Sequence, residues 1–406
     1  MNIAEATVRE LDDWDARTVD VSGGNVYQSR TWASQRARLG WRPRFLVFDD
    51  GYRLLSLERP WRLVGGAGAY LARGPVAAGE PVTQTAARLV AAANYLASQG
   101  IDVVASDAEI ETASGYPGLI EAAGFRLIEE VQPSRHRVAL ALEPGAGEPA
   151  LFGAFATSIR QRVRHAERSG LRVIRWDVRH EAEPNDGFEA PPVAEEPRRV
   201  QTPADSGMPA IWPAAPVFDR FYDLLLSTAA RRGFGLGPRQ AFVDWSCAAL
   251  DVGHLVYLEV RSPTDDLLGG ATFYRHGGRL TYSNSGDRAD LRHSYPGVIH
   301  LLLWRAIQLA LRDGLVEMDL AGVDVTGSRR EPVEGDEMYG LYAFKRSFGA
   351  TWRELSGNHE LVVRPVRYAL GRLTGKLPLP NPGSRPRAAH TTDAESRPRQ
   401  PGPVDG

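Results

Sequence analysis

Segments with helical and with strand periodicity follow one another in the same order in both halves of this 406-residue chain. In the first half the expected elements are a helix at 27–39, strands at 45–48 and 52–58, a helix at 82–99 and a strand at 101–106. In the second half they are a helix at 241–251, strands at 254–261, 269–275 and 279–285, a helix at 296–313 and a strand at 316–320. This repeated order predicts two tandem domains of α+β or mixed α/β class.

Changes in composition indicate the domain boundaries. We expect the first domain to span residues 1–148 and the second 149–350. Residues 180–216 are dense in Pro, Ala, Glu and Asp and lack a hydrophobic period, which predicts a loop or disordered insertion in the second domain. From residue 377 the chain is rich in Pro, Ser and Arg, which predicts a disordered tail.

Charge and cysteine content limit the classes of function. The net charge of −2 excludes a generally cationic nucleic-acid-binding protein, so we expect no DNA partner and only a local patch for any polyanion. One cysteine, Cys247, is compatible with a reducing compartment and is expected to be a core residue. We see no signal peptide, and His300 and Arg305 interrupt the most apolar run. We therefore expect a cytoplasmic protein.

Lysine is almost absent from the sequence. Of 48 Lys and Arg residues, only Lys345 and Lys376 are lysine. Lys345 lies in a short expected helix that ends at Gly349, with Phe344 beside it. A compact ammonium can approach one developing negative oxygen, whereas the guanidinium fork suits carboxylate or phosphate. Lys345 is either a solvated helix residue or a catalytic cation.

The expected helix at residues 151–169 carries a row of cations. Arg160, Arg164 and Arg168 follow one another at intervals of four, and Glu167 is the one acidic residue among them. Like charges at this spacing destabilise a helix unless an anion offsets them. The row is either a solvated face or a site for an RNA backbone or a pyrophosphate.

Two α/β halves are also typical of acyltransferases of the GNAT type, an analogy of fold alone. A coenzyme A enzyme would carry an Arg/Gln-x-x-Gly-x-Gly/Ala loop between a strand and a helix, where backbone N–H groups bind the pyrophosphate. Residues 286–297, after the strand at 279–285, lack this pattern. The glycines at 65–68 precede no helix and are a weak phosphate signal. Coenzyme A is therefore disfavoured but not excluded.

Short motifs in a fixed order carry a resemblance to a known family. They are Gln28…Trp32, Tyr70…Arg73-Gly74-Pro75-Val76, Gly124-Phe125, Gln132-Pro133, Arg160…Arg164…Ala166-Glu167-Arg168-Ser169-Gly170, Arg231…Gly233-Phe234, Tyr282, Trp304…Ala306-Ile307, Asp319-Leu320…Gly322 and Phe344-Lys345…Phe348-Gly349. In this order the chain resembles the FemABX family of tRNA-dependent aminoacyltransferases, which add bridge amino acids to peptidoglycan precursors. The resemblance covers residues 20–365, and the Phe-Lys…Phe-Gly element is its most specific part.

The resemblance implies two tandem GNAT-like domains, with residues from about 351 to 376 crossing back to complete the first. It implies an aminoacyl-tRNA as donor and co-substrate, no other cofactor, and a peptidoglycan precursor as acceptor. The long coiled-coil arm of some members is missing here, since the Arg-rich helix continues directly into Leu171. A mode of tRNA docking that depends on such an arm is thus in doubt.

Residue roles also follow from the resemblance. Lys345 would be the catalytic cation and Phe344 its packing partner. Arg36, Arg231 and Tyr282 would hold the nucleotide-pyrophosphate part of the acceptor, with Arg73 as a further substrate-binding residue. Arg36 replaces the family's usual lysine, and Arg232 or Arg239 could serve instead of Arg231.

The general base is open. Asp319 and Asp107 are candidates, each also readable as a helix cap or turn residue, and the substrate itself could supply the base. No His, Cys and Asp spacing suggests a metal. We expect Lys345→Ala to lose about a hundredfold or more in turnover, at little cost in stability.

Three readings of function stay open. The first is transfer of an amino acid from tRNA to a stem peptide of lipid II or UDP-MurNAc-pentapeptide. The second is another N-acyl transfer, from coenzyme A or from aminoacyl-tRNA to a small metabolite. The third is a non-enzymatic RNA-binding module. The basic amphipathic helix expected at 366–377 either docks on the first domain or contacts anionic lipid at the inner membrane face.

Overall fold

The protein is described from a computed structural model. The structure describes residues 1–61, 63–129, 135–143, 145, 147–179, 186–191, 215–233, 235–323 and 330–374. The predicted tail from residue 377 lies outside them, as does most of the predicted insertion at 180–216.

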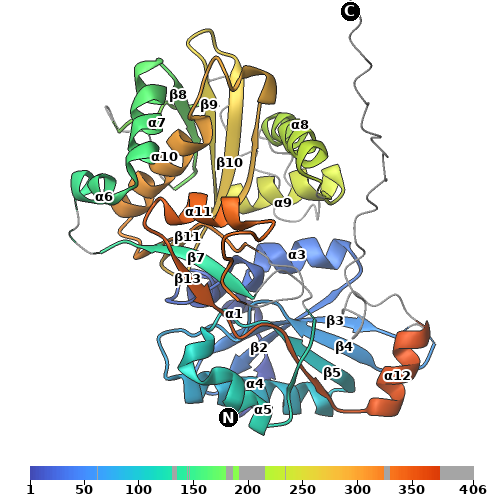
Figure 1. Ribbon diagram of the computed structural model, residues 1–406. Helices are drawn as coiled ribbons and strands as arrows, with labels where there is room; N and C mark the ends of the chain where they lie inside the picture. Colours follow the sequence, from blue (N-terminus) through green and yellow to red (C-terminus); the bar gives the residue numbers. More distant parts are fainter. Residues whose placement is uncertain are drawn as a thin grey trace, which may run out of the picture.

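Most strands of the first half of the chain form one seven-stranded sheet (Figure 1). In spatial order its strands are β1 (Ile3–Glu5), β2 (Arg42–Phe48), β3 (Arg53–Pro60), β4 (Ala67–Leu71), β5 (Ile101–Ser106), β14 (His359–Val362) and β6 (Arg126–Leu127). The parallel pair β4–β5 is joined through helix α4 (Val82–Ser98), and the other pairs are antiparallel. Strand β5 is buried along its whole length, because helices cover one face and the second half covers the other.

The second seven-stranded sheet has the same kind of topology. Its strands are β13 (Thr351–Glu354), β7 (His136–Ala141), β12 (Glu317–Asp319), β11 (Arg279–Asp287), β10 (Leu267–His276), β9 (Leu255–Arg261) and β8 (Arg172–Trp176). Here the parallel pair is β11–β12, joined through helix α10 (Val298–Arg312). The predicted mixed α/β class is therefore confirmed.

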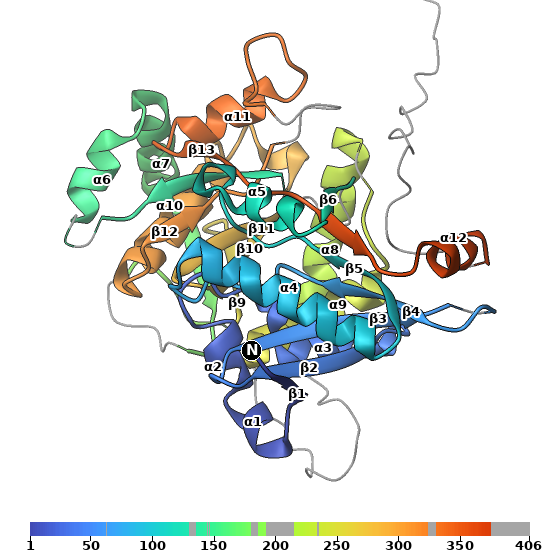
Figure 2. The ribbon, with the colours of Figure 1, turned by 90° about the horizontal axis from the view of Figure 1, so that it is seen from below.

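Helices pack on both sheets. In the first half they are α1 (Val8–Asp12), α2 (Trp14–Thr18), α3 (Arg30–Arg38), α4 and α5 (Tyr116–Ala122), with short 3₁₀ turns at Val26–Gln28 and Thr112–Ser114. In the second half they are α6 (Glu148–Ala154), α7 (Thr157–Arg168), α8 (Ala215–Arg232), α9 (Arg239–Asp251), α10, α11 (Tyr339–Arg346) and, at the end, α12 (Pro365–Thr374), with a 3₁₀ turn at Ala289–Leu291. Figure 2 shows α4 crossing one face of the first sheet, while α3 lies on the other face next to α9.

The chain passes between the two sheets more than once. Strand β7, within the predicted first domain, pairs with β12 and β13 of the second sheet. Strand β14 then returns and pairs with β5 and β6 of the first sheet. The division into domains at residues 148 and 350 stays a prediction. Strand β13 pairs in the second sheet although it lies beyond residue 350, the predicted end of the second domain.

A shared hydrophobic core joins the two halves. It combines residues of α3, β3 and β5 with residues of α8, α9 and β9. At its centre the Trp32 ring meets the Trp245 ring edge-on, with centroids 4.9 Å apart. Beside them Gln35 Nε2 donates to Ala241 O at 3.1 Å. Two further cores lie between α4 and the first sheet and between α7, α10 and the second sheet.

Part of the predicted insertion is ordered. Phe188 is buried, and Glu189 pairs with β8 through Glu189 N to Val173 O at 2.8 Å and Arg175 N to Glu189 O at 3.0 Å. Residues 186–191 therefore form an irregular segment that one bridge anchors to β8. A short apolar anchor in a polar segment gives no periodic signal, so only the tertiary contact reveals it.

Within the described ranges, no helix has both the length and the apolarity that crossing a bilayer requires.

Candidate active site

Lys345 lies on the inward face of α11. Its side chain is buried, and Nζ donates to Ala321 O at 3.0 Å and to Gly322 O at 2.8 Å. The helix ends at Arg346, before the predicted end, and a turn follows to Gly349 at φ 83°, a left-handed conformation that glycine adopts without steric cost. The reading of Lys345 as a solvated helix residue is therefore excluded.

The two carbonyls that face Lys345 come from the loop after β12. Ala321 adopts φ 62°, and its N–H donates to Asp319 Oδ1 at 2.8 Å, which tightens the turn. Next along the loop, Val323 N donates to His136 Nε2 at 2.6 Å. A side chain at Gly322 would come within 2.9 Å of His136 O. The loop is thus held from β7, and its carbonyls are preorganised around the ammonium.

Phe344 points to a different neighbour from Lys345. Its ring meets His300 of α10 at 5.2 Å and Phe348 at 5.4 Å, both edge-on. Burial and the nearby charge of Arg162 lower the pKa of His300 to about 4, so its imidazole is neutral at pH 7. Phe344 therefore links α11 to α10. Sequence reasoning took His300 as structural and did not place it here.

The two candidate bases are both buried. Burial raises the pKa of Asp319, whose Oδ2 lies 3.5 Å from Thr281 Oγ1. Burial likewise raises the pKa of Asp107, which accepts from Tyr70 Oη at 2.7 Å and from Arg73 N at 2.6 Å. Asp107 therefore holds the backbone just after β4, whereas Asp319 ends β12, directly before the loop whose carbonyls face Lys345.

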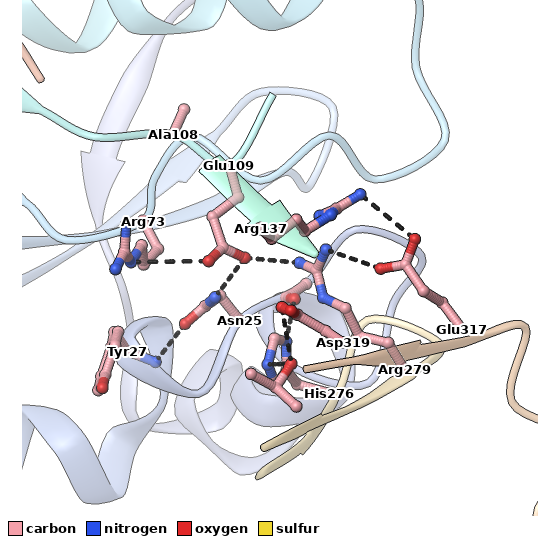
Figure 3. Close-up of polar contacts among 12 residues, drawn as sticks. Asn25, Tyr27, Arg73, Ala108, Glu109, Arg137, His276, Arg279, Glu317 and Asp319 are labelled. Atoms are coloured by element: carbon pink, nitrogen blue, oxygen red, sulfur yellow. Dashed lines mark hydrogen bonds and ion pairs between the residues drawn. The ribbon is translucent and has the colours of Figure 1, made fainter. Parts of the chain in front are cut away.

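A buried charge cluster lies between the two sheets (Figure 3). At its centre, Glu109 Oε2 accepts from Asn25 Nδ2 at 2.9 Å and from Arg279 Nη2 at 2.7 Å, and Oε1 lies 3.7 Å from Arg73 Nε. Burial alone would raise the pKa of Glu109, but Arg279 and Arg73 outweigh it and lower the pKa to about 2. The carboxylate is therefore charged at neutral pH and ties both halves together.

The cluster continues towards β12. Arg137 lies 3.5 Å from Glu317, and Arg279 Nη1 lies 4.0 Å from the same carboxylate. His276 Nδ1 contacts Gly24 O at 2.8 Å, and burial and Arg279 lower its pKa to about 3. These residues were not predicted. The signal available was the acidic pair at 107 and 109 directly after a fully buried strand.

Arg36 stacks on aromatic rings at the end of α3. Its guanidinium carbon lies 4.9 Å from the Trp32 ring and 5.5 Å from the Trp41 ring. Arg59 lies 5.6 Å from the same Trp41 ring, so two cations share one aromatic surface. Burial lowers the pKa of Arg36, and its Nε is buried with no hydrogen-bond partner among the described residues. Two neighbouring guanidiniums without a carboxylate among the described residues suit an anionic ligand.

The Arg231 side chain already has a protein partner. Arg231 Nη2 lies 2.9 Å from Asp287, which Arg292 also binds at 2.7 Å. The alternative Arg239 pairs with two carboxylates on α8, Asp219 at 2.9 Å and Asp223. Arg232 is exposed and has no ion pair in the described part of the chain.

Tyr282 lies on β11, the strand that also carries Asp287. Its hydroxyl donates to Ser285 Oγ, and its ring packs on Phe273 at 5.7 Å. Burial raises the pKa of Tyr282, while the nearby charge of Arg232 opposes this. The structure therefore brings Tyr282, Arg231 and Arg232 to one region. Arg36 lies in α3, which packs on the first sheet, and Arg73 lies in the charge cluster between the two sheets.

The cationic row of α7 is present on the surface. Ile159, Val163 and Ala166 are buried, which turns Arg164 and Arg168 outward and leaves Arg160 half-buried. Glu167, the one acid of the segment, pairs with Arg305 at 3.1 Å. The row therefore keeps its positive potential.

Neither of two surface cavities contains a predicted site residue. One of about 830 Å³ lies between the N-terminus and α4, and one of about 460 Å³ lies between α10 and residues 142–148. Within the described ranges, His, Cys, Asp and Glu nowhere gather in a group of three that could hold a metal.

Comparison with solved structures identifies the fold. A structure titled FemX is 16% identical, matches with a TM-score of 0.69 and covers 91% of this chain and 99% of its own. L-PGS from Bacillus licheniformis is 12% identical, with a TM-score of 0.47, covering 92% and 98%. A tandem GNAT protein from the clavulanic acid biosynthesis pathway is 13% identical, with a TM-score of 0.41, covering 88% and 97%. With its two helix-covered sheets, the chain has the fold of the FemX structure.

Sequence comparison gives a match over part of the chain. The FemAB family model matches residues 261–376, which include Tyr282, Asp319 and Lys345. The predicted resemblance to the FemABX family is thus confirmed, and the match agrees with the predicted class of enzyme, an aminoacyltransferase. No curated protein matches this sequence.

Proposed function

We propose that the protein transfers an amino acid from aminoacyl-tRNA to the amine of a peptidoglycan precursor stem peptide. The observation that carries this proposal is Lys345. In a chain with two lysines, one is buried, held by two loop carbonyls, and lies in the segment that matches the FemAB family. Because charged tRNA is the donor, the proposal places the protein in the cytoplasm.

The reaction requires little chemistry from the protein. The acceptor nitrogen attacks the ester carbonyl, a C–N bond forms, the ester C–O bond breaks, and the tRNA ribose hydroxyl leaves with a proton. Placing both substrates can supply several kcal/mol of the barrier. A cation at the developing oxyanion supplies about 3–4 kcal/mol more, the role we assign to Lys345. Asp319 is our candidate for the group that takes the amine proton.

The two substrates would bind to different surfaces. The row of Arg160, Arg164 and Arg168 suits the phosphates of a tRNA acceptor arm, since phosphate contacts depend on clustered Lys and Arg. Arg36, with Arg59 across the shared Trp41 ring, suits the pyrophosphate of the acceptor. Tyr282 and Arg231 stay substrate-binding candidates, and Arg73 becomes a candidate for positioning the interface instead.

The identity of the donor tests this proposal. The purified protein is incubated with mixed charged tRNAs, or with acetyl-CoA, and with UDP-MurNAc-pentapeptide or lipid II, and the products are weighed by mass spectrometry. We expect a mass increase of one amino acid that ribonuclease pretreatment of the donor abolishes. Acetylated product, or product formation that survives ribonuclease, would favour the coenzyme A reading instead.

A further inference from the structure

Helix α12 is fixed on the first sheet by one of its faces. Tyr368 and Gly371 are buried there, and a side chain at Gly371 would come within 2.5 Å of the Trp61 ring. Trp61 Nε1 donates to Asp102 Oδ2 at 2.7 Å, and Arg367 Nε lies 3.0 Å from Asp102 Oδ1. The predicted docking of this helix on the first domain thus takes place, and it determines which face points outward.

The outward face of α12 is apolar. Val366 is 74% exposed, Leu370 45% and Leu373 84%, at the spacing of successive helical turns. Pro365 and Ala369 are exposed beside them. A helix packed on a domain by one face normally presents polar side chains on the other. Among residues 365–373 of α12, whose burial the structure describes, every exposed residue is apolar, so burying this face elsewhere would be favourable.

Cations surround this face. Arg367 and Arg372 flank it along the helix. Arg364 precedes it, and its guanidinium donates inward to Ile101 O at 2.8 Å and Ala97 O at 3.0 Å. The helix carries no acidic residue. Among the described residues, two carboxylates lie beneath the helix: Asp102 is buried, with Arg367 at 3.0 Å and Arg364 at 3.4 Å from it, and Glu360 is buried and paired with Arg126 at 2.6 Å.

The neighbouring turn extends the patch. Leu63 is 79% exposed in the turn between β3 and β4. The ends of that turn touch α12, because Trp61 lies under Gly371 and a side chain at Gly66 would come within 3.2 Å of Arg367 Cδ. Figures 1 and 2 both show α12 beside this end of β3 and β4.

We propose that α12 and the β3–β4 turn dock on an anionic lipid bilayer. An exposed apolar helix face flanked by arginines is the pattern of a helix lying in a membrane interface, with its apolar side chains among the acyl chains and its cations at the headgroups. Because Arg367 and Arg372 are positively charged, charge complementarity favours an anionic membrane as the partner of this face. Membrane docking itself does not depend on the proposed function. Only its consequence, access of the active site to a lipid-linked acceptor, rests on that function. Arg59, two residues before Trp61, places the candidate pyrophosphate site at the same end of the first sheet.

Vesicle binding by the full chain tests this surface. We compare cosedimentation with vesicles of phosphatidylglycerol and phosphatidylcholine and with vesicles of phosphatidylcholine alone. We expect binding to the anionic vesicles that falls at least tenfold in Val366→Glu/Leu373→Glu and weakens with salt. The matched control is Val8→Glu/Leu226→Glu, which changes two exposed apolar residues far from α12 and leaves binding intact.

Two results would overturn the inference: no binding to anionic vesicles, or equal binding by the α12 variant and the wild type. Sedimentation velocity provides a third such result. If the wild type is a dimer and the α12 variant is a monomer, this face binds a second copy of the chain and not a membrane. Activity on soluble UDP-MurNAc-pentapeptide separates the two proposals. If the variant keeps that activity and loses turnover only on vesicle-borne lipid II, both hold. If the wild type transfers nothing to either acceptor yet binds vesicles, the proposed function alone fails.

Discussion

Lys345 brings a charge into the interior, against the carbonyl oxygens of Ala321 and Gly322. Such a site holds the ammonium in one position, and a fixed ammonium suits both a structural and a catalytic role. Burial also changes one expectation. Removing Lys345 would leave two buried carbonyls without this donor, a loss of about 1–3 kcal/mol each in stability. The sequence-based expectation of little stability cost therefore does not follow from this geometry.

Substitution of Lys345 separates the two roles. We expect Lys345→Ala to lose about a hundredfold or more in kcat, because one oxyanion donor is worth that much. Lys345→Arg should lose activity nearly as fully, since the planar fork cannot occupy the position of a compact ammonium. Thermal unfolding defines a temperature at which each variant is folded, and kcat is measured there. The control is exposed Arg346→Ala, and a folded Lys345→Ala enzyme with wild-type kcat would contradict the assignment.

Glu109 predicts a pH dependence of stability. Its folded pKa of about 2 lies below its ordinary value of 4.5, so its contribution is fully present above about pH 4.5 and is lost as pH falls towards 2. The difference corresponds to about 3 kcal/mol at neutral pH. In urea unfolding at several pH values, Glu109→Gln should be less stable than the wild type at pH 7, and the gap should narrow below pH 4. A gap that stays constant with pH would show that the charge of Glu109 contributes nothing.

At the scale of elements, α12 depends on one close approach. The helix reaches the Trp61 ring because residue 371 has no side chain. A helix interior normally disfavours glycine by about 1 kcal/mol relative to alanine. The close packing of Gly371 on the Trp61 ring accounts for a glycine at this position.

A pair of glycine substitutions tests this contact. Gly371→Ala should destabilise the protein by about 1–3 kcal/mol, because the new methyl group overlaps Trp61. The matched control is Gly118→Ala in α5, where nothing lies within 4 Å and the same change should be neutral or slightly stabilising. Chemical denaturation measures both variants. Equal stability of the two would show that α12 does not lie against Trp61 in solution.

At the scale of the whole molecule, the two sheets share a core and a chain path. Strands β7 and β13 belong to one sheet while β14, which follows them, belongs to the other. The Trp32–Trp245 contact and the Glu109 cluster connect the halves through apolar and charged groups respectively. We therefore expect the halves to unfold together.

Truncating Trp245 tests this coupling. Trp245→Ala should cost about 3–5 kcal/mol, and Trp245→Phe less, because the cavity left by the second change is smaller. In calorimetry the wild type should give a single transition whose midpoint falls in both variants. Two separate transitions, of which only one moves, would show that the halves are independent.

The sequence alone determined the local features of this protein. Period and turn signals were sufficient for two α/β halves, for the short helix before Gly349 and for the outward Arg row of α7, because each depends on neighbours within a few residues. The scarcity of lysine and the order of motifs were sufficient to single out Lys345 and the FemABX resemblance.

Only the tertiary structure decided what depends on distant residues. The carbonyls at Lys345 come from 23 and 24 positions earlier, and Glu109 meets Arg279 from 170 positions away. No periodic pattern encodes such pairs, because they arise when the sheets assemble. The same reason applies to α12: the sequence predicts an amphipathic helix, but the position of Trp61 selects the face that is buried and leaves an apolar face exposed.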